Sequence, residues 1–496
     1  MESKKKRLKN WLTDKHNLIA LIIIGFGILL RLYYLFQTHS QTLWWDEAEY
    51  LLLGQYLATG DMFMNFLASR PLLLPLIVAF FIKIGLHHEI VYRMLELIIS
   101  SLGIVFLYKT TKELFNKEVG IISALLLSVF YLHLFYTARI LLDSIAPTFW
   151  VLSIYFFTTG YLIKKNNKRF YLSALFGAIG ILFYNQTIAL FLLYLIFLLL
   201  VEKLNLIKEK RFYLFGIIAL ATLSINFILN QIIHKDPIAF IKIGIKVGDV
   251  LTANYWQNLW SYSSYLTSYL GIILTIVFFI TLVIVFFKMI LGLDIVIKKP
   301  DLEMKKNLFL FLWLFVSFFA LIKIVGHFED RYIMPTFLPL FIVTALGLYK
   351  LKESISKSFD KRIVYAVLII LLVVISFTQV KKSEETIKMK VDSFAPLKEA
   401  ALWIKDNSNS QDTILTSSSP MMLYYSQRKI TPFPEKEEEL LPLIEKEKPK
   451  YLVLSVFTGN PTYVNNLLSY KIFNPVKTYK LGDSTVLIIS EIKYNQ

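Results

Sequence analysis

The sequence contains no cysteine, which excludes disulfide bonds and thiolate metal sites. It also lacks a Walker phosphate-binding loop, a dinucleotide-binding fingerprint and a nucleophile elbow. No basic, aromatic-bearing soluble module stands out, so nucleic acid is not an expected partner. The longest connection expected inside the cell, residues 288–306, is too short to form a domain for a nucleotide-sugar donor.

Long apolar runs are abundant. Hydrophobic residues make up 56% of the 496 residues, and the mean hydropathy is +0.57. A water-soluble globular chain has about 45–50% apolar residues, and crossing a bilayer takes about 20 consecutive ones. The first run, from Leu18 to Phe36, is too long for a signal peptide and lacks a small-residue cleavage site. The chain is therefore predicted to be a polytopic α-helical membrane protein.

The runs predict about 11 spans. They lie near residues 17–36, 91–108, 119–137, 142–163, 170–184, 186–201, 212–233, 266–288, 307–326, 332–350 and 363–380.

The distribution of Lys and Arg predicts the orientation. With the N-terminus inside, the inside segments carry 26 of these residues and the outside loops carry 7. This asymmetry accounts for much of the net charge of +17 and favours a cytoplasmic N-terminus with an outside C-terminal tail. The segment 71–86 is then expected to lie at the outer surface, because a full crossing there would invert every later loop.

Three regions follow from this reading. Residues 1–16 form a basic cytosolic N-terminus, and residues 17–380 form the transmembrane domain, with a large outside first loop at 37–90. Residues 381–496 are polar and charged. Strand-like runs at 413–418, 451–457 and 484–490 alternate with helical patterns at 396–407 and 435–447 in this tail, which predicts a small α/β domain outside the cell.

The first outside loop opens with the acidic sequence WWDEAEY. Asp46, Glu47 and Glu49 follow two tryptophans, and residues 47–59 have the pattern of a helix lying along the membrane. An aromatic belt with solvated acids would explain the tryptophans. Adjacent carboxylates near a bilayer surface also suit a general base or a cation site, so both readings stay open for Asp46 and Glu47.

Two further polar clusters lie at outer ends of spans. In ARILLDS, Arg139 and Asp143 are four residues apart, so one helical face could carry both as a structural ion pair or a functional one. GHFEDRYIMP places five polar or ionisable residues within six positions between two apolar spans. Arg70 and Arg93 add positive charge on the same side, where an anionic phosphate is the natural partner of a planar guanidinium.

The order of these motifs resembles that of the GT-C membrane glycosyltransferases, specifically the superfamily of protein O-mannosyltransferases and lipid A aminoarabinose transferases. The matching elements are WWDEAEY, Arg70-Pro71-Leu72, YRMLELIISSLG, KELFNKEVG, ARILLDS and HFEDRYIMP. They cover roughly residues 15–380, and the tail resembles the outside α/β domains of archaeal and bacterial members.

The resemblance implies transfer of a sugar from a polyprenyl-phosphate donor to an acceptor hydroxyl at the outer membrane face, with inversion. Asp46 would be the general base, with Glu47 as alternative or helper. The residues expected to bind the donor phosphate are Arg70, Arg139, His327, Arg331 and Tyr332, supported by Asp143, Arg93 and Glu329. The expected partners are the dolichyl- or undecaprenyl-type lipid, membrane lipid and a protein, lipid or glycan acceptor.

No cofactor is required by the residues, which leave open a divalent cation between the acids and the phosphate. Two rival functions also stay open. A transporter or flippase of a lipid-linked or anionic substrate would likewise have many spans and charges near the membrane, although such proteins often show two related halves. A catalytically inert assembly protein could use the tail as a binding module.

Overall fold

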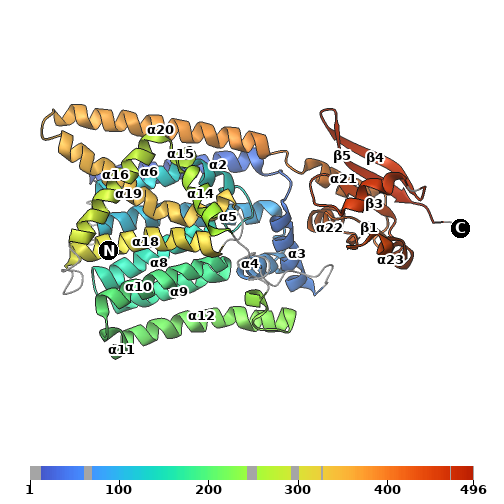
Figure 1. The fold of residues 1–496 in the computed structure, drawn as a ribbon, viewed down its shortest axis with the longest axis horizontal. Helices are drawn as coiled ribbons and strands as arrows, with labels where there is room; N and C mark the ends of the chain where they lie inside the picture. Colours follow the sequence, from blue (N-terminus) through green and yellow to red (C-terminus); the bar gives the residue numbers. More distant parts are fainter. Residues whose placement is uncertain are drawn as a thin grey trace. The chain divides into compact units, whose positions relative to one another are not determined.

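The computed structural model describes residues 13–60, 70–242, 254–291, 301–324, 328–469 and 471–494 (Figure 1). The chain divides into two compact units. The membrane unit comprises Met1–His39, Ala68–Leu73 and Glu89–Ile387, and the sheet unit comprises Ser40–Leu67, Leu74–His88 and Lys388–Gln496. Most of the predicted first outside loop thus groups with the tail, and the domain limits drawn from the sequence stay a prediction.

The membrane unit is built of helices. They are α2 (Lys15–Thr38), α5 (Glu89–Leu114), α6 (Lys117–Val129), α7 (Tyr131–Thr137), α8 (Ile145–Phe157), η1 (Thr158–Leu162), α9 (Asn167–Phe183), η2 (Asn185–Thr187), α10 (Ile188–Glu202), α11 (Asn205–Lys208), α12 (Lys210–His234), α14 (Tyr255–Ser264), α15 (Leu266–Leu270), α16 (Ile272–Leu291), α18 (Leu302–Ile324), η3 (Asp330–Ile333), α19 (Met334–Ile355) and α20 (Lys361–Lys390). The last of these continues into the first residues of the sheet unit.

Helices lie at all eleven predicted spans. Among the described residues, eight helices are long and apolar enough to cross a membrane, or nine if the bent pair α6–α7 counts as one span. The two remaining predictions, 170–184 and 307–326, coincide with α9 and α18. The polytopic helical fold predicted from the sequence is therefore confirmed.

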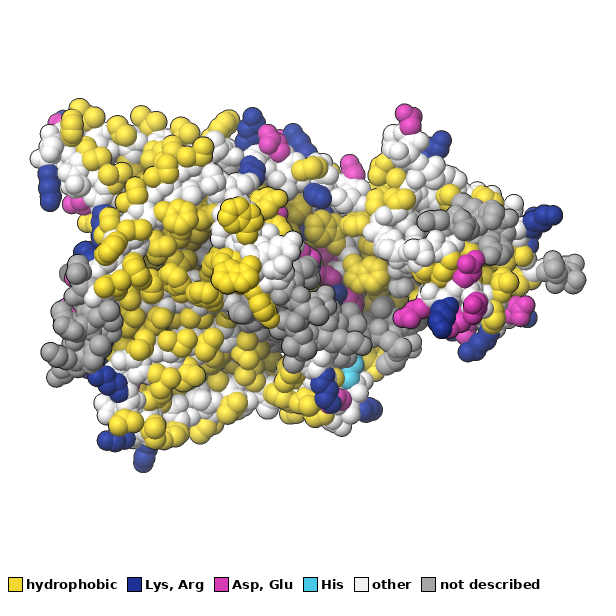
Figure 2. Space-filling view, in the orientation of Figure 1, with side chains coloured by type: hydrophobic (Ala, Val, Ile, Leu, Met, Phe, Trp, Pro, Cys, Tyr) yellow, Lys and Arg dark blue, Asp and Glu magenta, His cyan; other side chains and the backbone are white. Residues whose placement is uncertain are grey.

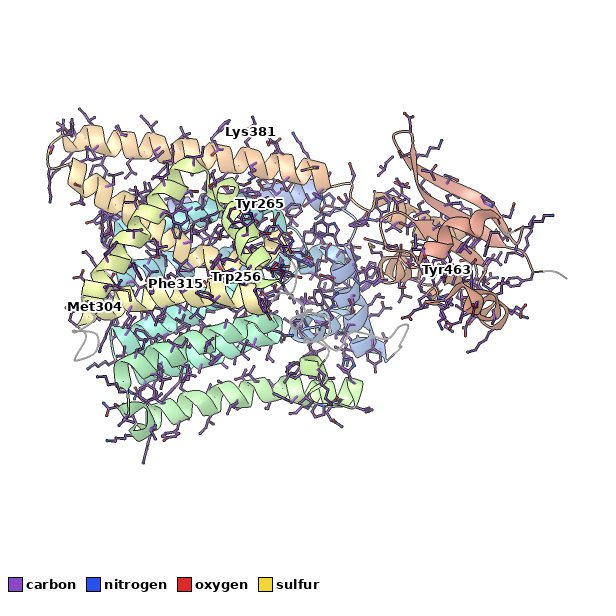
Figure 3. All side chains as sticks on the ribbon, viewed as in Figure 1. Trp256, Tyr265, Met304, Phe315, Lys381 and Tyr463 are labelled. Carbon is purple, nitrogen blue, oxygen red and sulfur yellow. The ribbon has the colours of Figure 1, made fainter. Side chains whose placement is uncertain are left out.

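The surface of the membrane unit is apolar. On the face drawn in Figure 2, hydrophobic side chains cover most of the helices. Inside, aromatic rings pack between helices, as where the buried Phe157 ring of α8 lies 4.3 Å from the Tyr194 ring of α10. Phe315, labelled on α18 in Figure 3, is half-buried. Apolar side chains on the outside of a spanning helix face lipid instead of water, so their exposure carries no hydrophobic free-energy penalty.

A buried arginine donates hydrogen bonds to the backbone carbonyls at the break between α6 and α7. The two helices meet at Phe130 with a bend of 56°, which leaves carbonyls at the end of α6 without helical partners. Arg31, only 1% exposed, donates from Nη1 to the Ser128 carbonyl at 3.1 Å and from Nη2 to the Leu127 carbonyl at 3.3 Å. Gly27 permits this approach, because a Cβ there would lie 2.8 Å from the Ser128 hydroxyl.

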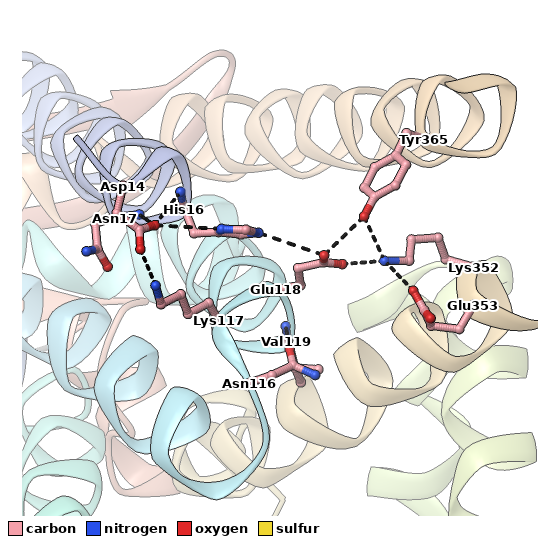
Figure 4. A network of polar contacts seen from close by, with 10 residues as sticks. All are labelled: Asp14, His16, Asn17, Asn116, Lys117, Glu118, Val119, Lys352, Glu353 and Tyr365. Carbon is pink, nitrogen blue, oxygen red and sulfur yellow. Dashed lines mark hydrogen bonds and ion pairs between the residues drawn. The ribbon is translucent and has the colours of Figure 1, made fainter. Parts of the chain in front are cut away.

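Four helix ends are joined by a second set of polar contacts, here called the lysine cluster (Figure 4). Lys117 at the start of α6 binds Asp14, the N-cap of α2. Lys352 near the end of α19 binds Glu118 and the Tyr365 hydroxyl of α20. His16 and Glu353 complete the cluster, so the starts of α2, α6 and α20 are tied to the end of α19.

In the sheet unit, two helices come from the predicted outer loop. The first, α3 (Trp45–Thr59), and the second, α4 (Leu73–Lys83), pack where Gly54 faces Val78, and a Cβ on Gly54 would lie 2.3 Å from the Val78 side chain. With 11 residues α4 is shorter than the length of about 20 that crosses a bilayer. The helix is thus too short to cross a bilayer by itself, and its place at the outer surface stays a prediction.

A five-stranded sheet of order β2-β1-β3-β5-β4 forms the tail. The strands are β1 (Thr413–Leu415), β2 (Lys429–Thr431), β3 (Tyr451–Ser455), β4 (Phe473–Leu481) and β5 (Ser484–Ile492). The first three are parallel, and β5 runs antiparallel to both β3 and β4. The helices are α21 (Ala395–Asp406), α22 (Ser419–Ser426) and α23 (Leu440–Glu447), with the short turns η4 (Glu437–Glu439) and η5 (Thr462–Ser469).

The strands expected from the sequence were the inner ones. Their apolar runs became β1, β3 and β5, whereas the edge strands β2 and β4 were not predicted. Most of β4 is exposed and interrupted by register shifts, so it carries no alternating apolar signal.

Candidate functional site

The acidic motif of the sequence begins helix α3 in the sheet unit. Glu47 is fully buried, and its Oε2 accepts a hydrogen bond from the Trp44 backbone N–H at 2.6 Å. Asp46 lies in the first turn and is half-buried. Both carboxylates lie beside the backbone N–H groups of the first helical turn, which favour negative charge nearby. Glu47 thus fixes the start of the helix, and Asp46 is the more accessible carboxylate.

The loop before α3 is fastened to the tail. The Leu43 N–H donates to the Tyr425 hydroxyl of α22 at 3.0 Å. Lys398 of α21 donates to the Ser40 carbonyl at 3.1 Å and lies 5.3 Å from the centre of the Tyr425 ring. The acidic motif is therefore held on the C-terminal fold by contacts within one unit.

In the membrane unit, two motifs that are far apart in the sequence meet at Arg331. Its Nη1 lies 3.8 Å from Asp143 Oδ2, and its Nε donates to Glu329 Oε2. The guanidinium carbon also lies 5.2 Å from the centre of the Tyr332 ring. Asp143 is 4% exposed and accepts a hydrogen bond from the Tyr184 hydroxyl at 3.3 Å. These residues form the arginine cluster.

Two tyrosines hold the turn that carries Arg331. The Tyr262 hydroxyl donates to the Glu329 carbonyl at 3.2 Å and accepts from the Glu329 N–H at 3.3 Å. The Tyr269 hydroxyl donates to Asp330 Oδ1 at 2.5 Å. Burial raises the pKa of the Tyr262 hydroxyl, so it stays a neutral donor at physiological pH.

The turn that carries Asp143 is held from α5. Arg93, which is fully buried, donates from Nη1 to the Ala138 carbonyl at 2.7 Å and lies 3.7 Å from Glu89. The Ser144 hydroxyl donates to Glu96, also on α5. Arg139 is fully buried, with its guanidinium 5.8 Å from the Phe135 ring.

One local expectation was wrong. Arg139 and Asp143 were expected on one helical face, but the residues between α7 and α8 form turns. The hydrogen bond from Arg93 to the carbonyl after α7 helps to hold this irregular backbone.

Two further predicted phosphate contacts are Arg70 and His327. Arg70 is half-buried, directly before Pro71 in the membrane unit. His327 lies outside the described residues. Within the part of the chain that the structure describes, no group of three or more His, Asp or Glu residues could hold a metal ion.

Sequence reasoning missed several residues that hold the site. Tyr184, Tyr262 and Tyr269 belong to apolar or aromatic runs and look like ordinary membrane composition. The dense run of Tyr and Ser at 261–269 could have singled out Tyr262 and Tyr269, because hydroxyls recur there at the predicted outer end of a span, but it gives no signal for Tyr184. The arrangement supplies buried guanidinium groups for an anion and, in the other unit, a carboxylate for a proton.

The fold is that of the membrane glycosyltransferases of GT-C type. ArnT from Cupriavidus metallidurans, solved bound to undecaprenyl phosphate, matches with a TM-score of 0.63 at 12% identity, over 95% of this chain and 97% of that one. The archaeal oligosaccharyltransferase AglB from Archaeoglobus fulgidus, solved with an inhibitory peptide and a dolichol-phosphate, matches with a TM-score of 0.61 at 11% identity, over 96% of this chain and 74% of that one.

A family model gives a second, independent likeness. The model described as dolichyl-phosphate-mannose-protein mannosyltransferase matches residues 69–228. No curated protein matches the sequence. The predicted resemblance to GT-C glycosyltransferases is confirmed, and the chain is a multi-pass membrane protein. Together the likenesses support a glycosyltransferase of GT-C type.

Proposed function

We propose that the protein transfers a sugar from a polyprenyl-phosphate donor to an acceptor hydroxyl at the outer membrane face. The observation that carries this proposal is the convergence of Arg331 and Asp143, which brings two distant motifs into one charged cluster. The solved relatives were captured with dolichol-phosphate and undecaprenyl phosphate, which supports a polyprenyl phosphate as the ligand of such a cluster. The excess of Lys and Arg in alternate connections supports an inside N-terminus and an outside tail.

The acceptor hydroxyl attacks the anomeric carbon while Asp46 removes its proton. A new bond forms between that carbon and the acceptor oxygen, and the bond from the carbon to the phosphate oxygen breaks. Polyprenyl phosphate leaves with the electron pair. Direct displacement of this kind inverts the anomeric configuration. Glu47, which is occupied by the helix start, positions Asp46 instead of reacting.

The leaving phosphate gains negative charge as the bond breaks. Arg331, held by Asp143 and Glu329, is fixed in orientation before the substrate arrives, which is what makes electrostatic stabilisation effective. Arg139, Arg70, Tyr332 and His327 are proposed as further phosphate contacts. Arg93 acts through the backbone at Ala138.

A paired set of variants tests this function. Asp46→Asn keeps the shape of the side chain but cannot accept the proton, so turnover should fall by roughly a hundred- to ten-thousand-fold with donor binding retained. Arg331→Ala should weaken donor binding as well, because the phosphate is anionic before the reaction. The readouts are the dissociation constant and single-turnover rate of a short-chain polyprenyl-phosphate sugar.

Asp483→Asn, an exposed acid in the hairpin between β4 and β5, is the matched control and should behave as wild type. Full activity of both Asp46→Asn and Glu47→Gln would remove the proposed base. Movement of intact donor across a vesicle membrane without sugar transfer would favour a flippase instead.

A further inference from the structure

A pocket beside the acidic motif lies wholly within the sheet unit. Its volume is about 470 Å³, within the range of roughly 300–1,000 Å³ typical of ligand sites. The lining side chains come from the start of α3, the segment before α21, the loop after β3 and the end of β4. They are Trp44, Met389, Lys390, Asp392, Ser393, Phe394, Phe457 and Leu481.

Aromatic rings form one side of this pocket. The Phe394 ring centre lies 6.4 Å from the Trp44 ring and 5.5 Å from the Phe457 ring, both at steep angles. All three rings are only half-buried, so their faces remain accessible. Flat, partly exposed aromatic faces are suited to the C–H face of a sugar ring, which is apolar although its rim carries hydroxyls.

Phe394 adopts an unusual backbone conformation. Its φ of +64° lies in the left-handed region, which is rare for a bulky residue and clusters at ligand sites. The Phe394 carbonyl accepts the Leu397 N–H at 2.9 Å and so starts α21. The strained backbone sets the direction of the Phe394 ring between its two neighbours.

Polar side chains line the same space. Asp392 and Ser393 directly precede Phe394, and Lys390 stands one turn earlier. A carboxylate, a hydroxyl and an ammonium group together can accept from and donate to several hydroxyls of one ligand. Asp392 and Lys390 are exposed, so a ligand in the pocket meets charged groups at its rim.

The place of the pocket in the fold also favours a compact ligand. Phe457 follows the carboxyl end of β3, and the Ser418 and Thr458 hydroxyls, 2.8 Å apart, join the loops after β1 and β3. Ligands of open parallel sheets bind at the carboxyl ends of strands. An extended peptide would instead pair along an edge strand. The loop that carries Phe457 follows the central strand β3, and Leu481 at the end of β4 is the one residue of the lining named above that comes from an edge strand.

From these features we infer that the pocket binds a sugar ring of the acceptor, so that the acceptor is a glycan or glycolipid. This inference rests on the proposed glycosyltransferase function and names its acceptor class. Trp44 is two residues from Asp46, so their backbones lie within about 7 Å. A sugar stacked on Trp44 therefore presents its rim hydroxyls beside the proposed base.

The test measures sugar binding apart from catalysis. The full chain in lipid nanodiscs is titrated with methyl glycosides of glucose, mannose, galactose and N-acetylglucosamine, observed by saturation-transfer NMR. At least one should bind, and Phe457→Ala and Asp392→Asn should each weaken it about tenfold, as expected for loss of a stacking face or a hydroxyl partner. Val456→Ala, at an exposed neighbouring residue outside the pocket lining, should change nothing.

Turnover then separates this inference from the proposed function. With an oligosaccharide acceptor, Phe457→Ala should raise KM and leave donor hydrolysis by water unchanged. Binding of none of the four glycosides, or equal binding by Phe457→Ala and wild type, would overturn the sugar site. So would a serine-containing peptide that competes at the pocket in a Phe457-dependent way. Absence of transfer by the wild-type protein, with sugar binding intact, would refute the glycosyltransferase and leave a sugar-binding protein.

Discussion

The membrane unit contains two clusters of charged side chains that use different cations. The lysine cluster of Figure 4 binds Asp14, Glu118 and Glu353 through Lys117 and Lys352. The arginine cluster binds Asp143 and Glu329 through Arg331. An ammonium group is a compact point charge, whereas a guanidinium presents a planar fork that matches a phosphate. The first cluster joins helix ends, and under the proposed function the second holds a guanidinium that contacts the donor phosphate.

The largest difference between the clusters should appear in kcat/KM when each cation is replaced by the other basic residue. Arg331→Lys keeps the charge but loses the planar fork, so kcat/KM for sugar transfer should fall on the order of a hundredfold. Lys352→Arg in the lysine cluster should leave the same constant within about threefold. Equal losses in the two variants would show that both clusters support catalysis only through the fold.

Removal of the cation in the lysine cluster should act on stability instead. Lys352 is almost fully buried, and Lys352→Met leaves Glu118 without this partner. We expect a loss of about 1–3 kcal/mol in the free energy of unfolding, seen as a lower Tm of the purified protein. Adding Glu118→Gln should restore part of it, because the uncompensated carboxylate is gone. A Tm equal to wild type in the single variant would contradict this role.

Removing one tyrosine hydroxyl that contacts each cluster should have a smaller effect on kcat/KM or Tm. Tyr262→Phe removes the two hydrogen bonds that hold Glu329, and should lower kcat/KM about two- to tenfold. Tyr365→Phe removes the contacts with Glu118 and Lys352, and should lower Tm while leaving kcat/KM alone. The comparison fails if Tyr365→Phe slows transfer and Tyr262→Phe does not.

The smallest effect concerns pH. The hydrogen bond from Lys117 lowers the pKa of Asp14 below its ordinary value of 3.8. A lowered pKa stabilises the folded protein above the ordinary value, and the contribution disappears as pH falls through the folded pKa. Asp14→Asn should therefore have a slightly lower Tm than wild type at pH 7, and the gap should close below pH 3.8. A gap that does not narrow as pH falls below 3.8 would mean that the contact does not depend on ionised Asp14.

The sequence predicted the spans well because each is a long apolar run whose signal is local. It predicted the inner strands β1, β3 and β5 for the same reason. For Arg331 and Asp143 the sequence predicted only that both lie on the same side of the membrane. Their contact could not be predicted, because it joins residues 188 positions apart and depends on helix packing. The supporting roles of Arg93 and Tyr262 could not be predicted, because both bind backbone atoms in irregular turns.

The buried arginine in α2 has a consequence for how the chain is made. Arg31 finds its carbonyl partner at Ser128, 97 residues later, so the first span leaves the ribosome before that partner exists. At roughly 5–20 residues per second the interval is about 5–20 s. An arginine at the centre of a lone helix costs about 2.5–3.5 kcal/mol on insertion scales. During this interval we expect α2 to stay near the insertion machinery or at a hydrated boundary, until the α6 carbonyls arrive and accept the hydrogen bonds of the guanidinium.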